Sequence, residues 1–220
     1  MARLMKVCVL AFAMLLPAMA VQAADDAIAL FNGKDLTGWT CKPNGWSVDD
    51  EGAIAWKKGC GYLWSEKTYQ NFVLDLDLKV DKGTNSGVFI RTVNKGNCVQ
   101  TGMEIQVLDS FGKKPPSKHD LGALYDIMAP SKNMAKKPGE WQHMTITCNG
   151  SILLVAVNGE QVIDVDLSKW TEGNKNPDGS KNKFKAPYCT MTKAGYLGFQ
   201  DHGKAVWYKN VTLKVLPDTK

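Results

Sequence analysis

Alternation of apolar and polar residues with a period of two runs through most of this 220-residue chain. The clearest case is 72–80, where Phe, Leu and Val alternate with Val, Asp and Lys. Successive side chains of a β-strand point to opposite faces, so this pattern predicts a long strand with one buried face. The segment 103–108 alternates in the same way. Two Asn-Gly dipeptides, 149–150 and 158–159, are typical hairpin turns and predict strands near 141–148, 151–157 and 160–165.

Shorter segments of the same kind complete the predicted set of strands: 28–31, 46–48, 53–56, 61–65, 86–92, 194–200 and the segment from 207 to 215. No helical stripe of any length separates them. About a dozen short strands with Gly, Asn and Pro turns predict an all-β fold, a jelly-roll β-sandwich of two antiparallel sheets. The stretches 109–138 and 168–193 lack the strand pattern, and loops of this length are often functional.

The first 23 residues have the features of a secretory signal peptide. Arg3 and Lys6 precede an apolar run over 7–16, and Val21-Gln22-Ala23 fits the small-x-small pattern of a cleavage site. The apolar run is much shorter than the roughly 20 residues that a membrane-spanning helix needs. We therefore expect cleavage after Ala23, one domain over 24–220, no membrane span, and a periplasmic or secreted location.

The charge balance argues against a nucleic-acid partner. The whole chain has 27 basic and 22 acidic residues, and loss of Arg3 and Lys6 lowers the net charge from +5 to +3. Many of the basic residues lie in the loop-like stretches, whereas a nucleic-acid binder concentrates them on one face. Solvated loop charge is the better interpretation.

Five cysteines follow the predicted cleavage site, and export would permit disulfides. The odd number leaves at least one thiol without an intramolecular partner. Cys41 and Cys60 flank a short predicted meander and form the preferred disulfide pair. The alternative is that all five cysteines are reduced and serve in packing.

The direction of side chains along the predicted strands places five polar residues, which we call the polar set, on one face. In 103–108 the apolar residues face one layer, so Glu104 and Gln106 face the other together. The same rule places Arg91 opposite the apolar face of 86–92, and Gln200 and His202 opposite that of 196–202. If these strands are neighbours, the five side chains converge on one concave surface. A solvated outer sheet is the alternative, but glycines near 83–87 and 198–203 would let a ligand approach the backbone.

Histidine and the aromatic residues add further candidates. His202 is of the residue type whose charge changes near neutral pH. A divalent metal is an open alternative if Glu104, Asp201 and His202 meet in space, although no HxH or HExxH spacing is present and no cofactor is certain. Aromatic side chains that could stack on sugar rings, or could equally pack in the core, are Trp46, Trp56, Trp64, Trp141 and Tyr125.

Eight short segments occur along the chain in a recognisable order: LFNGKDLTGW (30–39), NSGVFIR (85–91), EIQVLD (104–109), GALY (122–125), GEW (139–141), VNG (157–159), LGFQDHG (197–203) and WYKNV (207–211). Together they resemble the 3-keto-disaccharide hydrolase domain family over about 28–215. The resemblance implies a fold similar to the concanavalin A-like lectins and glucanases. It also implies a carbohydrate substrate already oxidised to a ketone at C3, and hence a separate sugar 3-oxidoreductase in the same pathway.

The resemblance implies a mechanism that needs one base, one acid and donors that stabilise an enolate. The base would remove the C2 hydrogen, the enolate would expel the C1 substituent, and water would add to the double bond. We expect Glu104 or His202 to be the base and the other to be the acid, with Arg91 and Gln106 at the oxyanion. Asp201 would orient His202. The residues expected to hold substrate are Gln106, Asn85, Tyr125, Trp141, Gln200 and Asp201.

Two other functions fit parts of the pattern. A noncatalytic, lectin-like carbohydrate-binding module would need only aromatic and amide side chains. A laminarinase-type glucanase would need two carboxyl groups roughly 5 Å apart, here Glu104 and Asp109. Gln106 stands between them, and Asp109 would share the face of Glu104 only through a bulge.

Overall fold

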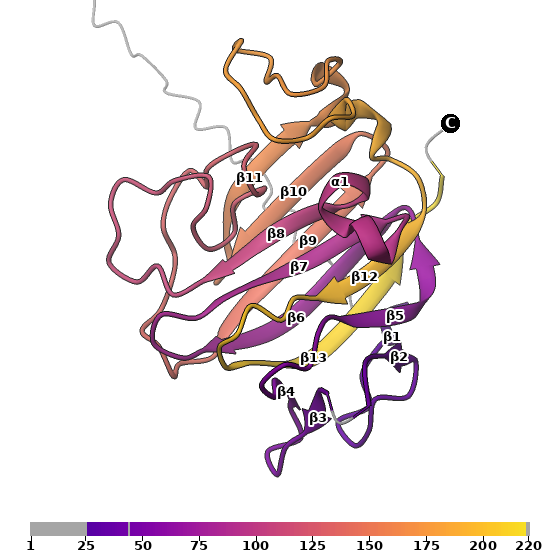
Figure 1. The fold of residues 1–220 in the computed structure, drawn as a ribbon, viewed down its shortest axis with the longest axis vertical. Helices are drawn as coiled ribbons and strands as arrows, with labels where there is room; N and C mark the ends of the chain where they lie inside the picture. The colour runs from indigo at the N-terminus through magenta and orange to yellow at the C-terminus, as the bar shows by residue number, and fades with distance from the viewer. Residues whose placement is uncertain (1–25, 44, 219–220) are drawn as a thin grey trace, which may run out of the picture.

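The computed structural model describes residues 26–43 and 45–218, which form two antiparallel sheets packed face to face (Figure 1). The predicted signal peptide, residues 1–23, lies outside the described residues. Within the described part of the chain, no helix has both the length and the apolar character needed to span a bilayer.

The larger sheet has eight strands and lies at the back in Figure 1. Its order is β11 (Glu160–Asp166), β10 (Ile152–Val157), β9 (Gln142–Asn149), β6 (Phe72–Val80), β13 (Val206–Val215), β4 (Ile54–Ala55) and β3 (Ser47–Val48), with β1 (Ile28–Ala29) paired to β13. Asn158 and Gly159 both have positive φ, 53° and 81°, which is the backbone of the tight turn predicted between β10 and β11.

The smaller sheet has five strands and lies at the front. Its order is β2 (Trp39–Thr40), β5 (Leu63–Tyr69), β12 (Gly195–Phe199), β7 (Asn85–Thr92) and β8 (Met103–Leu108). The short helix α1 (Cys98–Thr101) lies in front of this sheet (Figure 1). Three short 3₁₀ turns, η1 (Lys95–Asn97), η2 (Leu167–Lys169) and η3 (Tyr188–Thr190), complete the elements of the described residues.

The predicted all-β sandwich is confirmed, and the predicted strands lie within a few residues of the observed ones. The sequence pattern missed β2, which is too short to alternate, and the single-turn helix α1. The stretches 109–138 and 168–193 contain isolated bridges and 3₁₀ turns but no strand of the sheets. Both fold against the sandwich as long loops.

The two sheets differ on their outer faces. Every second residue of β6 is buried, and the residues between them, such as Asp75 and Asp77, remain half-buried. In β8, by contrast, all residues from Met103 to Val107 are buried. The outer face of the five-stranded sheet is therefore covered at β8, whereas that of the eight-stranded sheet is partly exposed to solvent at β6. The covered face is where the polar set was predicted.

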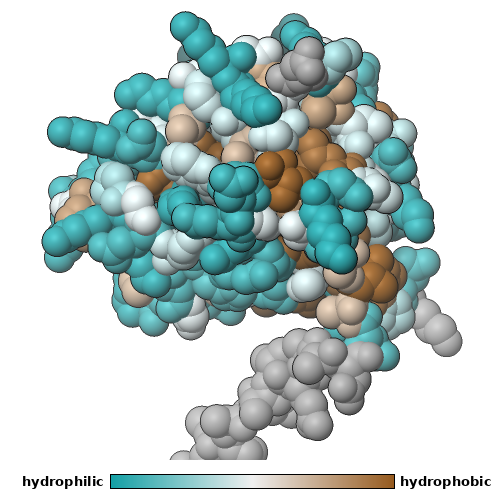
Figure 2. Space-filling view, turned by 90° about the horizontal axis from the view of Figure 1, so that it is seen from below, coloured by the Kyte–Doolittle hydropathy of each residue, from teal (hydrophilic) through white to brown (hydrophobic). Residues whose placement is uncertain are grey.

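The remaining surface offers little apolar area. Figure 2 shows a face that is mostly hydrophilic, with hydrophobic residues in small groups. The exposed large hydrophobic side chains of the described residues come from separate segments: Ile28, Val93, Phe111, Ile152 and Val215. Single apolar residues of this kind are usual on protein surfaces.

Arg91 does not lie on the outer face, so its predicted position is wrong. Tyr196 pairs with Thr92 and Gly198 with Phe89, which leaves one extra residue in β7. Arg91 lies at this bulge with a φ of 49°, and the bulge reverses its direction. Its buried guanidinium donates hydrogen bonds at 2.6 Å to the carbonyl of Gln70, at 2.8 Å to that of Gly150, and at 3.1 Å to Asn71 Oδ1.

The predicted disulfide is also not formed. Cys41 and Cys60 are both free thiols, as are the other cysteines of the described residues. Burial, together with the charge of the nearby Asp201 carboxylate, raises the pKa of Cys60 to about 12. The Cys60 side chain thus points towards Asp201, as a protonated donor.

Replacing Arg91 tests its structural role. Arg91→Met should lower the free energy of unfolding by about 3 kcal/mol, because three acceptors around the buried guanidinium lose a charged donor. Urea unfolding measures the change, with the exposed Lys67→Met as the matched control. An unfolding midpoint equal to that of the control would contradict this role.

Candidate functional site

A pocket opens on the outer face of the five-stranded sheet, where β7 and β8 meet the segment after β12. We call it the Glu104 pocket. Its lining residues are Tyr62, Asn85, Val99, Glu104, Gln106, Tyr125, Lys183, Gln200 and His202. The structure thus brings together six residues predicted from the sequence: Asn85, Glu104, Gln106, Tyr125, Gln200 and His202. Their roles stay predictions.

Glu104 lies at the base of this pocket because of the strand pairing. It stands opposite Phe89 in the β7–β8 ladder, and Gly87 stands opposite Gln106. The Glu104 carboxyl extends over Gly87, where a Cβ atom would overlap with Oε1. Only glycine at position 87 leaves room for this carboxyl.

The environment of Glu104 changes its acidity. The side chain is 6% exposed, and burial raises its pKa from 4.5 to about 7. The charge of Lys183 and a hydrogen bond from Gln200 act in the opposite direction. Near neutral pH both protonation states are therefore populated, which suits a group that accepts and returns a proton.

Two buried amides next to Glu104 have unsatisfied oxygens. Gln106 Nε2 donates to Asn85 Oδ1 at 2.8 Å, and Gln200 Nε2 donates to the Tyr62 hydroxyl at 3.2 Å. Neither glutamine Oε1 has a hydrogen-bond partner among the described residues. Buried polar atoms are nearly always paired, so these two oxygens have hydrogen-bond acceptor capacity beside the pocket that no described residue uses.

An aromatic cluster adjoins the pocket, and of its three rings that of Tyr62 lines it. The rings of Tyr62, Trp64 and Phe89 lie 5.5 to 5.9 Å apart, centroid to centroid. Trp64 occupies the space above Gly198, where a Cβ atom would overlap with the ring. Burial raises the pKa of Tyr62 to about 12, so its hydroxyl stays protonated at neutral pH. A pocket with aromatic walls and a few polar groups is typical of a small-ligand site.

The rim of the pocket comes from the long loops. Tyr125 lies 4.9 Å from the ring of His119 and 3.9 Å from Lys183 Nζ, measured to the ring centroid of Tyr125. His202 is exposed on the segment after β12. Lys183 and Tyr62 were missed from the sequence. Tyr62 shares the parity of Trp64, which could have identified it, but Lys183 lies in a loop without any periodic pattern.

Asp201 does not line the pocket. Its Oδ1 accepts from Trp56 Nε1 at 2.6 Å and from the Gly203 amide at 2.9 Å, and its Oδ2 accepts from the Gly61 amide at 2.9 Å. Adjacent side chains point apart. Asp201 therefore binds the 56–61 segment, and it neither orients His202 nor reaches the Glu104 pocket.

Trp141 lies on the other sheet. It precedes β9, and its ring lies beneath Lys79 Nζ at 4.8 Å and Lys209 Nζ at 4.0 Å, two residues of the eight-stranded sheet. The expectation that Trp141 lies with the other substrate-holding residues is therefore wrong. The sequence showed a strand at this position but not the sheet to which it belongs.

The pocket lining contains a single carboxyl group, that of Glu104. Asp109, the other acid considered for glucanase chemistry, accepts from the Gly83 amide at 2.8 Å in the β6–β7 turn. Among residues 26–43 and 45–218, no three His, Cys, Asp or Glu side chains come together as metal ligands, so Glu104, Asp201 and His202 do not form the metal set considered above.

Comparisons with known proteins agree with this fold. A protein of Bacteroides thetaiotaomicron named 3-keto-disaccharide hydrolase is 29% identical over an alignment of 231 residues. The match covers 88% of this chain and 79% of that protein. A crystal structure from Parabacteroides distasonis, of a protein provisionally assigned as a glycosyl hydrolase, is 35% identical with a TM-score of 0.79. The match covers 87% of this chain and 100% of that one.

The β-glucanase of Bacillus licheniformis is similar in fold alone. It has a TM-score of 0.52 and 11% identity, and the match covers 88% of this chain and 100% of that one. The sandwich is thus of the concanavalin A-like type.

The sequence profile of the 3-keto-alpha-glucoside-1,2-lyase-like domain matches residues 26–214, which is nearly the whole described chain. The chain therefore belongs to the 3-keto-alpha-glucoside-1,2-lyase-like domain family.

Proposed function

We propose that this protein is a hydrolase that cleaves 3-keto-glycosides, including 3-keto-disaccharides, in the Glu104 pocket. The observation that carries the proposal is one buried carboxyl with a pKa of about 7, next to two unpaired amide oxygens and the aromatic rings of Tyr62 and Tyr125 in the same pocket. The name of the Bacteroides relative and the family supports the substrate class.

A C3 ketone allows the bond to C1 to be cleaved with a single carboxyl group, which acts as the base. The ketone acidifies the C2 hydrogen, so a base can remove that proton while the electron pair moves onto the C3 oxygen as an enolate. When the C3 carbonyl re-forms, the electrons of the enolate's C2–C3 double bond shift to form a C1–C2 double bond. This shift expels the C1 oxygen, which takes up a proton. Water then adds to C1 and a proton returns to C2. The net reaction is hydrolysis.

The positions of the side chains favour one assignment. Glu104 is the base, because its carboxyl is buried and is partly ionised near neutral pH. His202, exposed at the rim, protonates the departing oxygen where the second sugar would leave towards solvent. Gln106 and Gln200 accept hydrogen bonds from ring hydroxyls through their unpaired oxygens. Tyr62 and Tyr125 pack against the sugar.

The predicted signal peptide would place this reaction in the periplasm or outside the cell. A separate oxidoreductase would then have to supply the 3-keto sugar, because hydrolysis does not change the oxidation state at C3.

Glu104→Gln tests the assignment of the base. It should lower kcat on a 3-keto-disaccharide such as 3-ketosucrose by about 10³-fold, the usual contribution of a general base. In the wild type, kcat/KM should rise as pH passes about 7, because only the ionised carboxyl of Glu104 accepts a proton. Release of free sugar measures both, and the exposed Glu66→Gln is the matched control. Full activity of Glu104→Gln would remove Glu104 from the mechanism. Binding without turnover by the wild type would instead identify a carbohydrate-binding module.

The raised pKa of Glu104 also predicts a cost in stability. The folded protein binds a proton at Glu104 more tightly than the unfolded chain, so stability should fall as pH rises from 4.5 through about 7. The full difference corresponds to about 3 kcal/mol. Glu104→Gln should match the wild type near pH 4 and exceed it by up to this amount at pH 8, as measured by urea unfolding. An equal pH dependence in both proteins would refute this.

Gly87→Ala tests the position of the carboxyl without removing it. The added methyl group would occupy the place of Glu104 Oε1 and displace the base. A displacement of about 1 Å can cost about 10²-fold in rate, so we expect a comparable loss of kcat/KM. Gly96→Ala, at an exposed turn with a non-positive φ, is the control. Activity equal to that of the control would show that the carboxyl does not depend on the bare backbone at position 87.

A further inference from the structure

The elimination described above develops negative charge on the C3 oxygen, and Arg91 is not available to stabilise it. Apart from His202, the lining of the Glu104 pocket contains one basic side chain, Lys183. Lys183 lies in the long loop 168–193, and the sequence patterns gave no indication of it.

The Lys183 ammonium group lies against a fixed part of the pocket. Its Nζ is 3.9 Å from the centroid of the Tyr125 ring, within the range of a cation–π contact. The Tyr125 amide in turn donates to the Glu104 carbonyl at 2.9 Å. Tyr125 thus connects the ammonium group to the strand that bears the catalytic carboxyl.

Hydrogen bonds hold the backbone of Lys183 from two sides. Its amide donates to Asp126 Oδ2 at 2.9 Å, and its carbonyl accepts from Gln100 Nε2 at 3.1 Å. The Gln100 Oε1 also accepts from the Lys185 amide at 2.9 Å. Helix α1 and the Asp126 turn therefore fix the position of this loop at Lys183.

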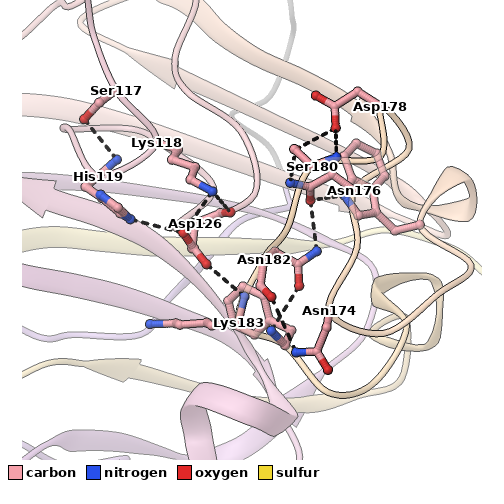
Figure 3. Close-up of polar contacts among 12 residues, drawn as sticks. Ser117, Lys118, His119, Asp126, Asn174, Asn176, Asp178, Ser180, Asn182 and Lys183 are labelled. Carbon is pink, nitrogen blue, oxygen red and sulfur yellow. Dashed lines mark hydrogen bonds and ion pairs between the residues drawn. The ribbon is translucent and has the colours of Figure 1, made fainter.

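Asp126 is itself held in place. Lys118 Nζ lies 3.0 Å and His119 Nε2 3.3 Å from its Oδ1. In Figure 3 these residues surround Asp126, and the Lys183 side chain extends away from Asn174 and Asn182. Burial opposes ionisation, but the bonds from Lys118 and the Lys183 amide keep the pKa of Asp126 below its ordinary value. The anchor of the loop is therefore a charged carboxylate at neutral pH.

We propose that Lys183 is a further catalytic residue, whose ammonium group binds the C3 oxygen of the substrate and stabilises the enolate that forms there. The inference rests on the proposed function. Proton abstraction by Glu104 moves an electron pair onto the C3 oxygen, and the positive charge of Lys183 lowers the energy of that state more than the energy of the neutral ketone. When the leaving group departs, the pair leaves the C3 oxygen and the ammonium group keeps its proton. Asp126 and Gln100 are positioning residues.

Variants of Lys183 test this role. Lys183→Met should lower kcat on 3-ketosucrose by about 10²-fold, the size of effect seen when one oxyanion donor is lost, with a smaller change in KM. Lys183→Arg should recover part of the rate. Lys181→Met, an exposed lysine of the same loop outside the pocket, is the matched control. A kcat for Lys183→Met equal to that of the control would overturn the proposal.

The pH profile gives a readout that a structural role would not move. Lys183 lowers the pKa of Glu104. The other titratable groups around Glu104 are His202, Tyr62, Tyr125, Cys98, Tyr188 and Tyr208. Loss of the Lys183 charge should shift the acidic limb of kcat/KM to higher pH in Lys183→Met. An unshifted limb would contradict the proposed proximity.

Exchange of the C2 hydrogen of free 3-ketoglucose in D₂O separates this inference from the proposed function, because exchange needs the enolate but no leaving group. If the wild type exchanges the C2 hydrogen faster than the enzyme-free rate and Lys183→Met does not, the proposed role of Lys183 is supported, even if no glycoside is cleaved. Cleavage and exchange that both persist in Lys183→Met would refute Lys183 and leave the proposed function standing. Neither exchange nor cleavage by the wild type would refute both.

Discussion

The burial of the Glu104 carboxyl over the bare backbone of Gly87 is the constraint on which the site depends. Removing a carboxyl from water penalises its charged form, which is why its pKa rises to about 7. An ordinary solvated sheet face would leave such a group near its usual pKa and fully ionised at neutral pH. The cover supplied by α1 and the two long loops thus converts an outward-facing strand residue into a group that can exchange a proton near neutrality.

Side-chain parity predicted that the polar side chains around Glu104 lie together, and they line one pocket. Glu104, Gln106 and Gln200 share a face because regular strands alternate, and they converge because β7 lies between β8 and β12. Parity failed where the backbone departs from regularity or where the sheet is not known. A bulge turns Arg91 inward, and Trp141 belongs to the opposite sheet. Neither the bulge nor the strand order leaves a period-two signature in the sequence.

Loop residues were beyond prediction for a different reason. Lys183 reaches the pocket because Asp126 and Gln100, 57 and 83 residues away in the chain, hold its backbone. Such contacts depend on the completed fold, and the loop composition of Lys, Asn and Gly does not single out any one lysine. The same holds for Cys60, which points to Asp201, a residue brought close by the return of the chain after β12.

The sandwich shared with a β-glucanase does not decide the chemistry, because a fold can host unrelated sites. Retaining hydrolysis of an unmodified glycoside generally needs two carboxyl groups roughly 5 Å apart. The Glu104 pocket offers one, since Gln106 occupies the position two residues along the strand and the Asp109 carboxylate binds the Gly83 amide. A single carboxyl group is too few for retaining hydrolysis of an unmodified sugar. It is sufficient as the base for elimination once a ketone acidifies the neighbouring C–H bond. What such a reaction then requires is a cation near the ketone oxygen, and the long loop brings Lys183 to the rim of the same pocket.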